Sequence, residues 1–157
     1  TRSSKAITAS AALLSLWTSG AVSIAEIRPM KNLILLVEDN EVTVDVMREQ
    51  LKFLGYRVVI ARNGAEAVAS AIAELPDLIV MDIQMPVMDG CQAAAQIRKE
   101  PKTQSIPILA ATAKAMSGDK QKCLDSGCNE YLAKPFTHRQ LQIAVEKLLC
   151  KPSNEPQ

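Results

Sequence analysis

The sequence predicts an α/β domain in which helices cover both faces of a parallel sheet. Three observations lead to this fold class. Short apolar runs alternate five times with stretches in which apolar residues recur at helical spacing. The apolar runs are continuous, as expected of parallel strands that are buried on both faces. Gly or Pro stands between many of the segments, where a chain commonly turns. Such an alternation favours a doubly wound sheet with right-handed crossovers.

Each element follows from its own pattern. The predicted strands are Leu33–Val37, Val58–Ala61, Leu78–Met81, Ile108–Ala111 and Tyr131–Ala133. The predicted helices are Val42–Leu54, Ala65–Leu75, Cys91–Lys99, Ser117–Ser126 and Thr137–Leu149. In the first helix Met47, Leu51 and Leu54 recur at i, i+4 and i+7, which gives that helix an apolar stripe for the core. The last helix has the same spacing.

Composition excludes several classes of protein. The 157 residues suit one domain, and 18 basic against 17 acidic residues give a net charge of +1. A nearly neutral chain lacks the basic field that drives nucleic-acid binding, and it has no polybasic tract for anionic lipid. No apolar run approaches the ~20 residues that span a bilayer. We therefore expect no nucleic-acid partner and no membrane contact by this domain.

The first thirty residues differ from the rest of the chain. They are rich in Ser and poor in acid, and four apolar residues fall at helical spacing before Gly20: Ile7, Ala11, Leu14 and Trp17. A linker helix from a longer parent protein, a targeting peptide and vector-derived sequence all fit, and we favour the first. We expect an N-terminal, partly helical extension over 1–30, a domain over 31–150 and a tail over 151–157.

The four cysteines do not form a recognisable metal or disulfide pattern. Cys91, Cys123, Cys128 and Cys150 have neither C-x-x-C pairing nor a suitably spaced His. A domain of this size needs no disulfide for stability. We expect free thiols in a reducing compartment, the cytoplasm, acting as small apolar residues without a redox role.

Chemically useful side chains collect at the carboxyl ends of four predicted strands. Glu38 and Asp39 follow the first strand, Asp82 the third, Thr112 the fourth and Lys134 the fifth. In an open parallel sheet that edge is where ligands bind. Three converging carboxylates need a cation, and a shallow site made only of oxygen ligands suits Mg²⁺. The hydroxyl and the ammonium group would suit an incoming phosphoryl group, for which a carboxylate can be the nucleophile.

Plainer interpretations exist for several of these residues. Asp39 fits the N-cap of the first helix, and Asp89 with Gly90 is typical of a turn. Lone His138 lies outside the acidic cluster, and we expect it to be a solvated surface residue. Val42 and Val44 fall off the apolar stripe, so they form either a partner-docking patch or a partly buried pair.

Four stretches give the sequence a resemblance to a known family. They are Leu-Val-Glu-Asp-Asn at 36–40, Val-Met-Asp-Ile-Gln-Met-Pro-Val-Met-Asp-Gly at 80–90, Ala-Ala-Thr-Ala at 110–113 and Tyr-Leu-Ala-Lys-Pro-Phe at 131–136. Over 31–150 the chain resembles the receiver domain of two-component response regulators, chemotaxis regulators included. The sequence around Asp82 is most similar to that of receivers of hybrid histidine kinases. The resemblance implies a flavodoxin-like (βα)5 fold with strand order 2-1-3-4-5.

The resemblance also implies roles at the site. Asp82 is then the phosphoacceptor for a phosphohistidine of a histidine kinase or histidine phosphotransfer domain. Asp39, Asp82 and the backbone carbonyl of Gln84 would ligate Mg²⁺, and Glu38 would act through a metal-bound water. Lys134 would contact the phosphoryl oxygens.

Further residues carry implied roles in switching and phosphoryl lifetime. Thr112 would bond the phosphoryl group while Tyr131 turns inward as the aromatic switch. Gln84 and Lys114 would flank the path of the hydrolytic water and tune the lifetime of the aspartyl phosphate. The Lys134–Pro135 bond is expected to be cis.

The leading hypothesis is a phosphorelay signalling module that catalyses only its own phosphorylation and dephosphorylation. We expect no output domain after Leu149, so that the output is either a protein contact or passes through a parent hybrid kinase N-terminal to this chain. A haloacid-dehalogenase-like phosphatase would need a second Asp where Gln84 stands, and a flavin carrier would need a phosphate cradle in the first loop. A degenerate receiver that binds partners without phosphorylation remains the alternative.

Overall fold

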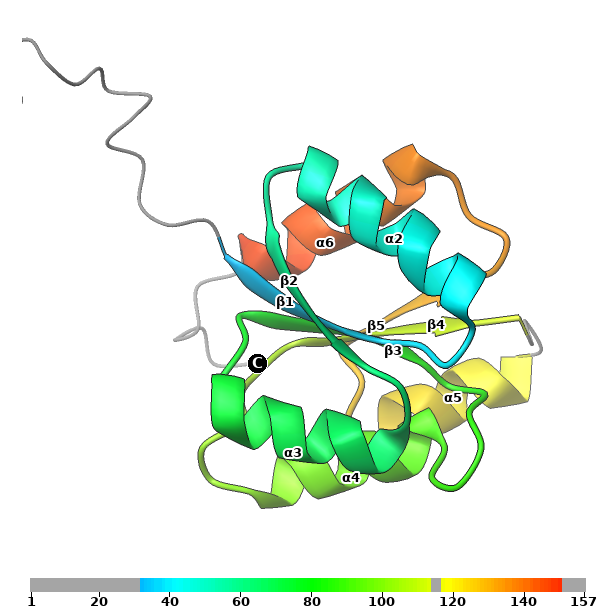
Figure 1. The fold of residues 1–157 in the computed structure, drawn as a ribbon. Coiled ribbons are helices and arrows are strands. Elements are labelled where there is room, and N and C mark those ends of the chain that lie inside the picture. The colour runs from blue at the N-terminus through cyan, green and yellow to red at the C-terminus, as the bar shows by residue number, and fades with distance from the viewer. Residues whose placement is uncertain (1–31, 114–116, 151–157) are drawn as a thin grey trace, which may run out of the picture. The chain divides into compact units, whose positions relative to one another are not determined.

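The computed structural model describes residues 32–113 and 117–150, and within them a single sheet carries the site (Figure 1). The strands are β1 (Leu33–Val37), β2 (Arg57–Ala61), β3 (Leu78–Asp82), β4 (Ile108–Thr112) and β5 (Glu130–Ala133). All neighbours pair in parallel, in the order β2-β1-β3-β4-β5. The predicted strand order is confirmed. Our expectations for 1–30, Lys114 and 151–157 concern residues outside the described ranges.

Five helices in the described ranges connect and cover the strands. They are α2 (Glu41–Phe53), α3 (Gly64–Glu74), α4 (Gly90–Lys99), α5 (Ser117–Asp125) and α6 (His138–Leu149). Figure 1 shows α2 and α6 on one face of the sheet and α3, α4 and α5 on the other. The predicted α/β alternation is therefore correct, and the predicted ends differ from the observed ones by a few residues at most.

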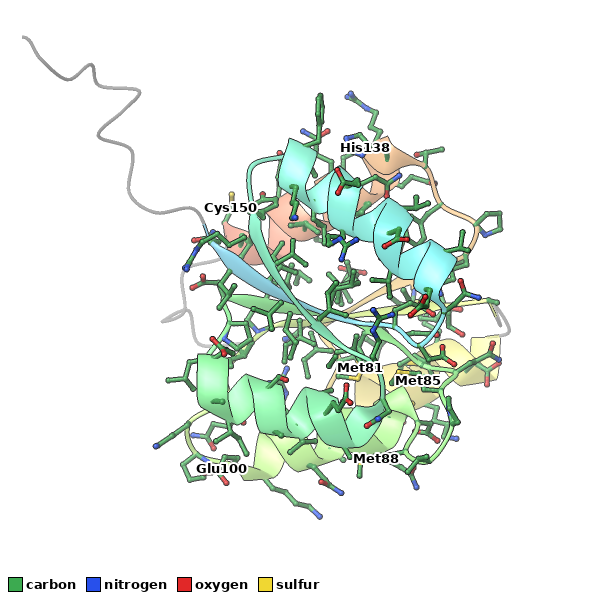
Figure 2. The ribbon with its side chains drawn as sticks, in the orientation of Figure 1. Met81, Met85, Met88, Glu100, His138 and Cys150 are labelled. Carbon is green, nitrogen blue, oxygen red and sulfur yellow. The ribbon has the colours of Figure 1, made fainter. Side chains whose placement is uncertain are left out.

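The sheet divides the core into two layers. Leu33–Val37, Leu78–Asp82 and Ile108–Thr112 are buried along their whole length, which explains their continuous apolar character. One layer packs Met81 with α3, α4 and α5, and the labelled Met81 and Met85 lie on that side in Figure 2. The other layer packs Leu51 of α2 with α6.

Local hydrogen bonds fix where the helices begin. Asn40 caps α2 by accepting a hydrogen bond from the backbone N–H of Thr43 at 3.0 Å. Asp89 caps α4 in the same way, by accepting from the backbone N–H of Gln92. The Gln92 side-chain oxygen accepts from the backbone N–H of Asp89, which completes a capping box. Because each cap directly follows a strand or its loop, it sets the path of the chain past the carboxyl edge of the sheet.

Two further expectations can be compared with the fold. The Lys134–Pro135 peptide bond is cis, as the resemblance implied. No helix in the described part of the chain is both long and apolar enough to cross a membrane.

Candidate functional site

Strand pairing brings the predicted site residues to one edge of the sheet. Val37 of β1 pairs with Met81 of β3, and Thr112 of β4 pairs with Ala133 of β5. The residues that follow these pairs therefore emerge side by side at the carboxyl edge. Glu38, Asp39 and Asp82 come together there, with Lys134 arriving from the end of β5.

The three carboxylates form a compact cluster. One oxygen from each of Glu38, Asp39 and Asp82 lies within 4.8 Å of the others. Glu38 and Asp82 are 3% and 6% exposed, whereas Asp39 is exposed. The cluster is therefore open to solvent on one side and closed on the other. That geometry fits a hard cation with oxygen ligands and bound water.

Lys134 supplies the positive charge of the site. Its Nζ lies 2.8 Å from Glu38 Oε2 and 3.7 Å from Asp82 Oδ1. The shorter contact is a hydrogen bond that Lys134 donates, so the ammonium group is bound to Glu38 rather than to Asp82. One cation beside three carboxylates leaves the cluster with a negative balance, which favours binding of a metal ion.

Backbone N–H groups orient two of the carboxylates. The N–H of Gln84 donates to Asp82 Oδ1 at 3.1 Å, and the N–H of Asn40 donates to Glu38 Oε1 at 3.2 Å. Both donors come two residues after the carboxylate that they bind. The loops that follow β1 and β3 thus hold the acidic side chains in place.

The electrostatic surroundings perturb Asp82. Burial raises the pKa of its carboxyl group to about 6, and the nearby charge of Glu38 adds to this effect. Lys134 and the Gln84 N–H group oppose it, because both stabilise the ionised form. A bound cation would lower this raised pKa, because it also stabilises the ionised form. The perturbed, partly neutralised carboxyl is consistent with a metal site at Asp82.

The two residues assigned to switching lie on the neighbouring strands β4 and β5 and have different surroundings. Thr112 is buried at the end of β4, and its carbonyl accepts a hydrogen bond from the Lys134 backbone N–H at 2.8 Å. Tyr131 lies on β5, is partly buried and packs against the core layer of α3, α4 and α5. Lys114 lies outside the described ranges.

The structure decides among the plainer interpretations. Asp39 does not cap α2, because Asn40 does. Asp89 caps α4, so its structural interpretation is correct. His138 was expected to be solvated, but it is half-buried, and its ring meets the ring of Phe53 edge-on with centroids 5.9 Å apart. In Figure 2 His138 lies at the start of α6, with Cys150 near the other end of that helix.

We expected Val42 and Val44 to form either a docking patch or a partly buried pair, but the structure separates the two residues. Val44 is fully buried because it shares the inner face of α2 with Met47, whereas Val42 is 72% exposed. Val42 instead lies with Val46, which we did not predict to be functional, in a groove of about 390 Å³. The other residues lining this groove are Thr43, Met47, Gln50, Ala113, Lys134, Pro135 and Phe136.

Comparison with known proteins gives consistent results. The family model described as the response regulator receiver domain matches residues 34–146. Hybrid signal transduction histidine kinase G of Dictyostelium discoideum is 44% identical over 117 residues, which are 73% of this chain and 3% of that kinase. The polar-differentiation response regulator DivK of Brucella anthropi is 36% identical over 108 residues, which are 69% of this chain and 88% of DivK.

A solved structure agrees with this chain in fold. The receiver domain of the sensor histidine kinase PA1611 from Pseudomonas aeruginosa PAO1 is 42% identical, with a TM-score of 0.73, and the match covers 77% of this chain and 99% of that one. That crystal structure has a magnesium ion coordinated in the active site cleft. With the matched family model, the fold and the acidic cluster in agreement, this chain belongs to the response regulator receiver domain family of two-component signalling.

Proposed function

We propose that Asp82 accepts a phosphoryl group from a phosphohistidine, so that the domain works as a phosphorelay receiver. One observation carries this proposal: the Asp82 carboxylate lies within 4.8 Å of two other carboxylates and 3.7 Å from the Lys134 ammonium group. A nucleophilic carboxylate flanked by a potential metal site and by a cation has what phosphoryl transfer chiefly needs, which is positioning and charge neutralisation.

The donor set supports Mg²⁺ as the cofactor. We propose Asp39, Asp82 and the backbone carbonyl of Gln84 as direct ligands, and Glu38 as a ligand through water. When bound, Mg²⁺ would neutralise charge on the incoming phosphoryl group. The exposed Asp39 and the buried Asp82 suit this arrangement, because the site opens to solvent on the side from which a donor must come.

The residues of this chain then share the work of transfer. An Asp82 oxygen attacks phosphorus, the bond between phosphorus and the donor imidazole breaks, and an acyl phosphate forms on Asp82. Lys134 needs only to shift from Glu38 towards Asp82 to contact the new phosphoryl oxygens. The Thr112 hydroxyl would donate a hydrogen bond to another phosphoryl oxygen. Tyr131 would then turn inward as the switch.

The groove beside the site supports a docked protein partner. Val42 and Val46 of α2 line it together with Pro135 and Phe136, and Lys134 of the acidic site lines it as well. An apolar groove that reaches a phosphoacceptor suits the helix that carries the donor histidine. We propose a histidine kinase or a histidine phosphotransfer domain as this partner, and a parent hybrid kinase remains part of the proposal.

Domain limits and phosphoryl lifetime belong to the same proposal. We take 31–150 as the receiver, 1–30 as an extension and 151–157 as a tail. Gln84 and Lys114 are proposed to control the access of water to the acyl phosphate, so that hydrolysis is catalysed by the domain itself and no external substrate is turned over.

The proposal is tested by intact mass after treatment with acetyl phosphate. Wild type, Asp82→Asn and the matched control Asp89→Asn are compared with and without Mg²⁺. Asp89 is a suitable control because Asn is also a good helix cap at that position. We expect one phosphoryl group on wild type and on Asp89→Asn with Mg²⁺, and none on Asp82→Asn. Labelling that persists in Asp82→Asn would place the phosphoacceptor at another residue, and absence of labelling from wild type would favour the phosphorylation-independent receiver.

A further inference from the structure

Two buried thiols meet between helices that the sequence places far apart. Cys91, near the start of α4, and Cys123, in α5, are 32 positions apart, and their sulfur atoms lie 3.9 Å from each other. They are 5% and 1% exposed. A disulfide requires a separation of about 2.05 Å, so the sulfur atoms would have to approach each other by a further ~2 Å to form one.

Cys123 has a special place in α5. Among residues 118–125 of that helix it is the one buried side chain, and most of the others are polar and exposed. The neighbouring helix α4, in contrast, buries Gly90, Cys91, Ala93, Ala94 and Ile97. The Cys123 side chain therefore joins α5 to the hydrophobic core, where its sulfur atom meets that of Cys91 in α4.

A cavity gives small molecules access to both sulfur atoms. It has a volume of about 200 Å³ and is lined by both cysteines, with Gln84, Thr112 and Lys122 among its other walls. A single water molecule takes up about 30 Å³ in the liquid, so hydrogen peroxide fits into this cavity readily. The two thiols are thus buried against bulk solvent but accessible to a small reagent.

We propose that Cys91 and Cys123 are a modification site, at which a small hydroperoxide joins them in a disulfide that clamps α5 onto α4. In the first step one thiolate attacks the O–O bond, which breaks to give a sulfenic acid and an alcohol, or water from hydrogen peroxide. The second sulfur then attacks the sulfenic sulfur and displaces water. Two thiols lose two electrons and two protons, and the peroxide bond is reduced.

The surroundings of the thiols set the rate of this reaction. Burial, with Cys91 alongside, raises the pKa of Cys123 to about 12. Because the thiolate is the reactive form, the pair stays reduced under brief exposure to peroxide. At pH values below about 12 the thiolate fraction, and with it the oxidation rate, rises about tenfold for each unit by which the pH is raised. Cys128 provides a matched control, because it is also buried with a pKa of about 12 but is not among the described residues that line the cavity.

The test uses the full chain with Cys150→Ser, which removes the exposed thiol. Hydrogen peroxide is added at pH 7, 8 and 9, and the protein is digested without reduction. We expect a loss of two hydrogen atoms and a peptide pair linked through Cys91 and Cys123, retained when Cys128→Ala is added. Backbone amides of α5 should then exchange with deuterium about tenfold more slowly, and dithiothreitol should reverse this.

Each remaining outcome overturns the proposal. A chain that keeps its full mass under conditions that oxidise a small model thiol has no oxidisable pair here. A disulfide that involves Cys128 places the reactive pair elsewhere. A Cys91–Cys123 disulfide that forms without slower deuterium exchange of the α5 amides would show that the bond does not hold α5 against α4. Because mass and exchange are both measured without any phosphodonor, a negative result here is independent of phosphorylation at Asp82.

Discussion

Lys134 and Glu38, which are 96 positions apart, form an ion pair in which Nζ lies 2.8 Å from Oε2. Glu38 is 3% exposed, and the Lys134 ammonium group is the cation that lies against its carboxylate. The pair joins the end of β1 to the end of β5 across the carboxyl edge of the sheet, and it holds the Lys134 ammonium group 3.7 Å from Asp82. The charge balance of the site therefore depends on one lysine.

Removing that lysine should destabilise the metal-free domain. Lys134→Met leaves a buried Glu38 carboxylate without its cation, and we expect a loss of about 2 kcal/mol in the free energy of unfolding. Urea denaturation without metal measures it. Lys147→Met is the control, because its pair with Glu130 is more exposed and should contribute less than about 1 kcal/mol. Equal losses for the two variants would contradict the account.

Asp82 should make the metal-free domain less stable at neutral pH. Its folded pKa of about 6 is raised above the ordinary aspartate value of 3.8, so between these two pH values the folded state holds a proton that the unfolded state has lost. Its contribution to stability is therefore present at low pH and is lost as the pH rises to about 6. Asp82→Asn should add about 2 kcal/mol at pH 7 and almost nothing at pH 4.

Thermal unfolding with and without Mg²⁺ measures this effect. Mg²⁺ favours the ionised carboxylate, so it should stabilise wild type and reduce the advantage of Asp82→Asn. A gain that is the same at pH 4 and pH 7 would show that burial does not raise the pKa of Asp82.

Two neighbouring valines of α2 should respond differently to truncation. Val44 is fully buried and Val46 is 52% exposed. Val44→Ala should cost about 2 kcal/mol, because it removes buried methyl groups and leaves a void, whereas Val46→Ala should change stability by less than about 0.5 kcal/mol. Chemical denaturation of the two variants measures both values. A larger loss for Val46 would mean that the inner face of α2 is assigned wrongly.

Two glycines also give a matched pair. A Cβ atom at Gly90 would lie 2.5 Å from the carbonyl oxygen of Asp82, which is backbone and cannot move aside. At Gly118 a Cβ atom would meet no atom within 4 Å. Gly90→Ala should therefore cost about 2 kcal/mol or more, and Gly118→Ala should add up to about 1 kcal/mol by favouring the helix. Melting temperatures that fall in both variants would contradict this.

The sequence predicted the sheet and the site well because both depend on simple periodic rules. Strands buried on both faces must be continuously apolar, and parallel pairing brings their carboxyl ends to one edge. The sequence alone therefore predicts that Glu38, Asp82 and Lys134 come together. The family resemblance added the strand order and the specific roles.

Other features depend on exact packing, which a local pattern does not contain. We took Met47, Leu51 and Leu54 as the stripe of α2, but the helix ends at Phe53 and Val44 takes the additional buried place. No sequence pattern singled out Arg98 near the end of α4, yet it donates to the carbonyl oxygens of Gln104, Ile106 and Gly127.

The contact between Cys91 and Cys123 was also absent from the sequence pattern, since it depends on how α4 and α5 pack. Contacts of this kind join residues with no regular spacing. They become visible when the helices are placed, and none of them follows from the composition of either helix.

The most direct test of the central claim is to trap the phosphoacceptor chemically. Wild type is treated with acetyl phosphate and Mg²⁺, reduced with borohydride, which converts an aspartyl phosphate to homoserine, and digested for mass spectrometry. The account predicts homoserine at position 82 and at no other acidic residue, and none when Mg²⁺ is omitted. Homoserine at Asp39 or Asp89 in place of Asp82, or unmodified Asp82 throughout, would contradict it.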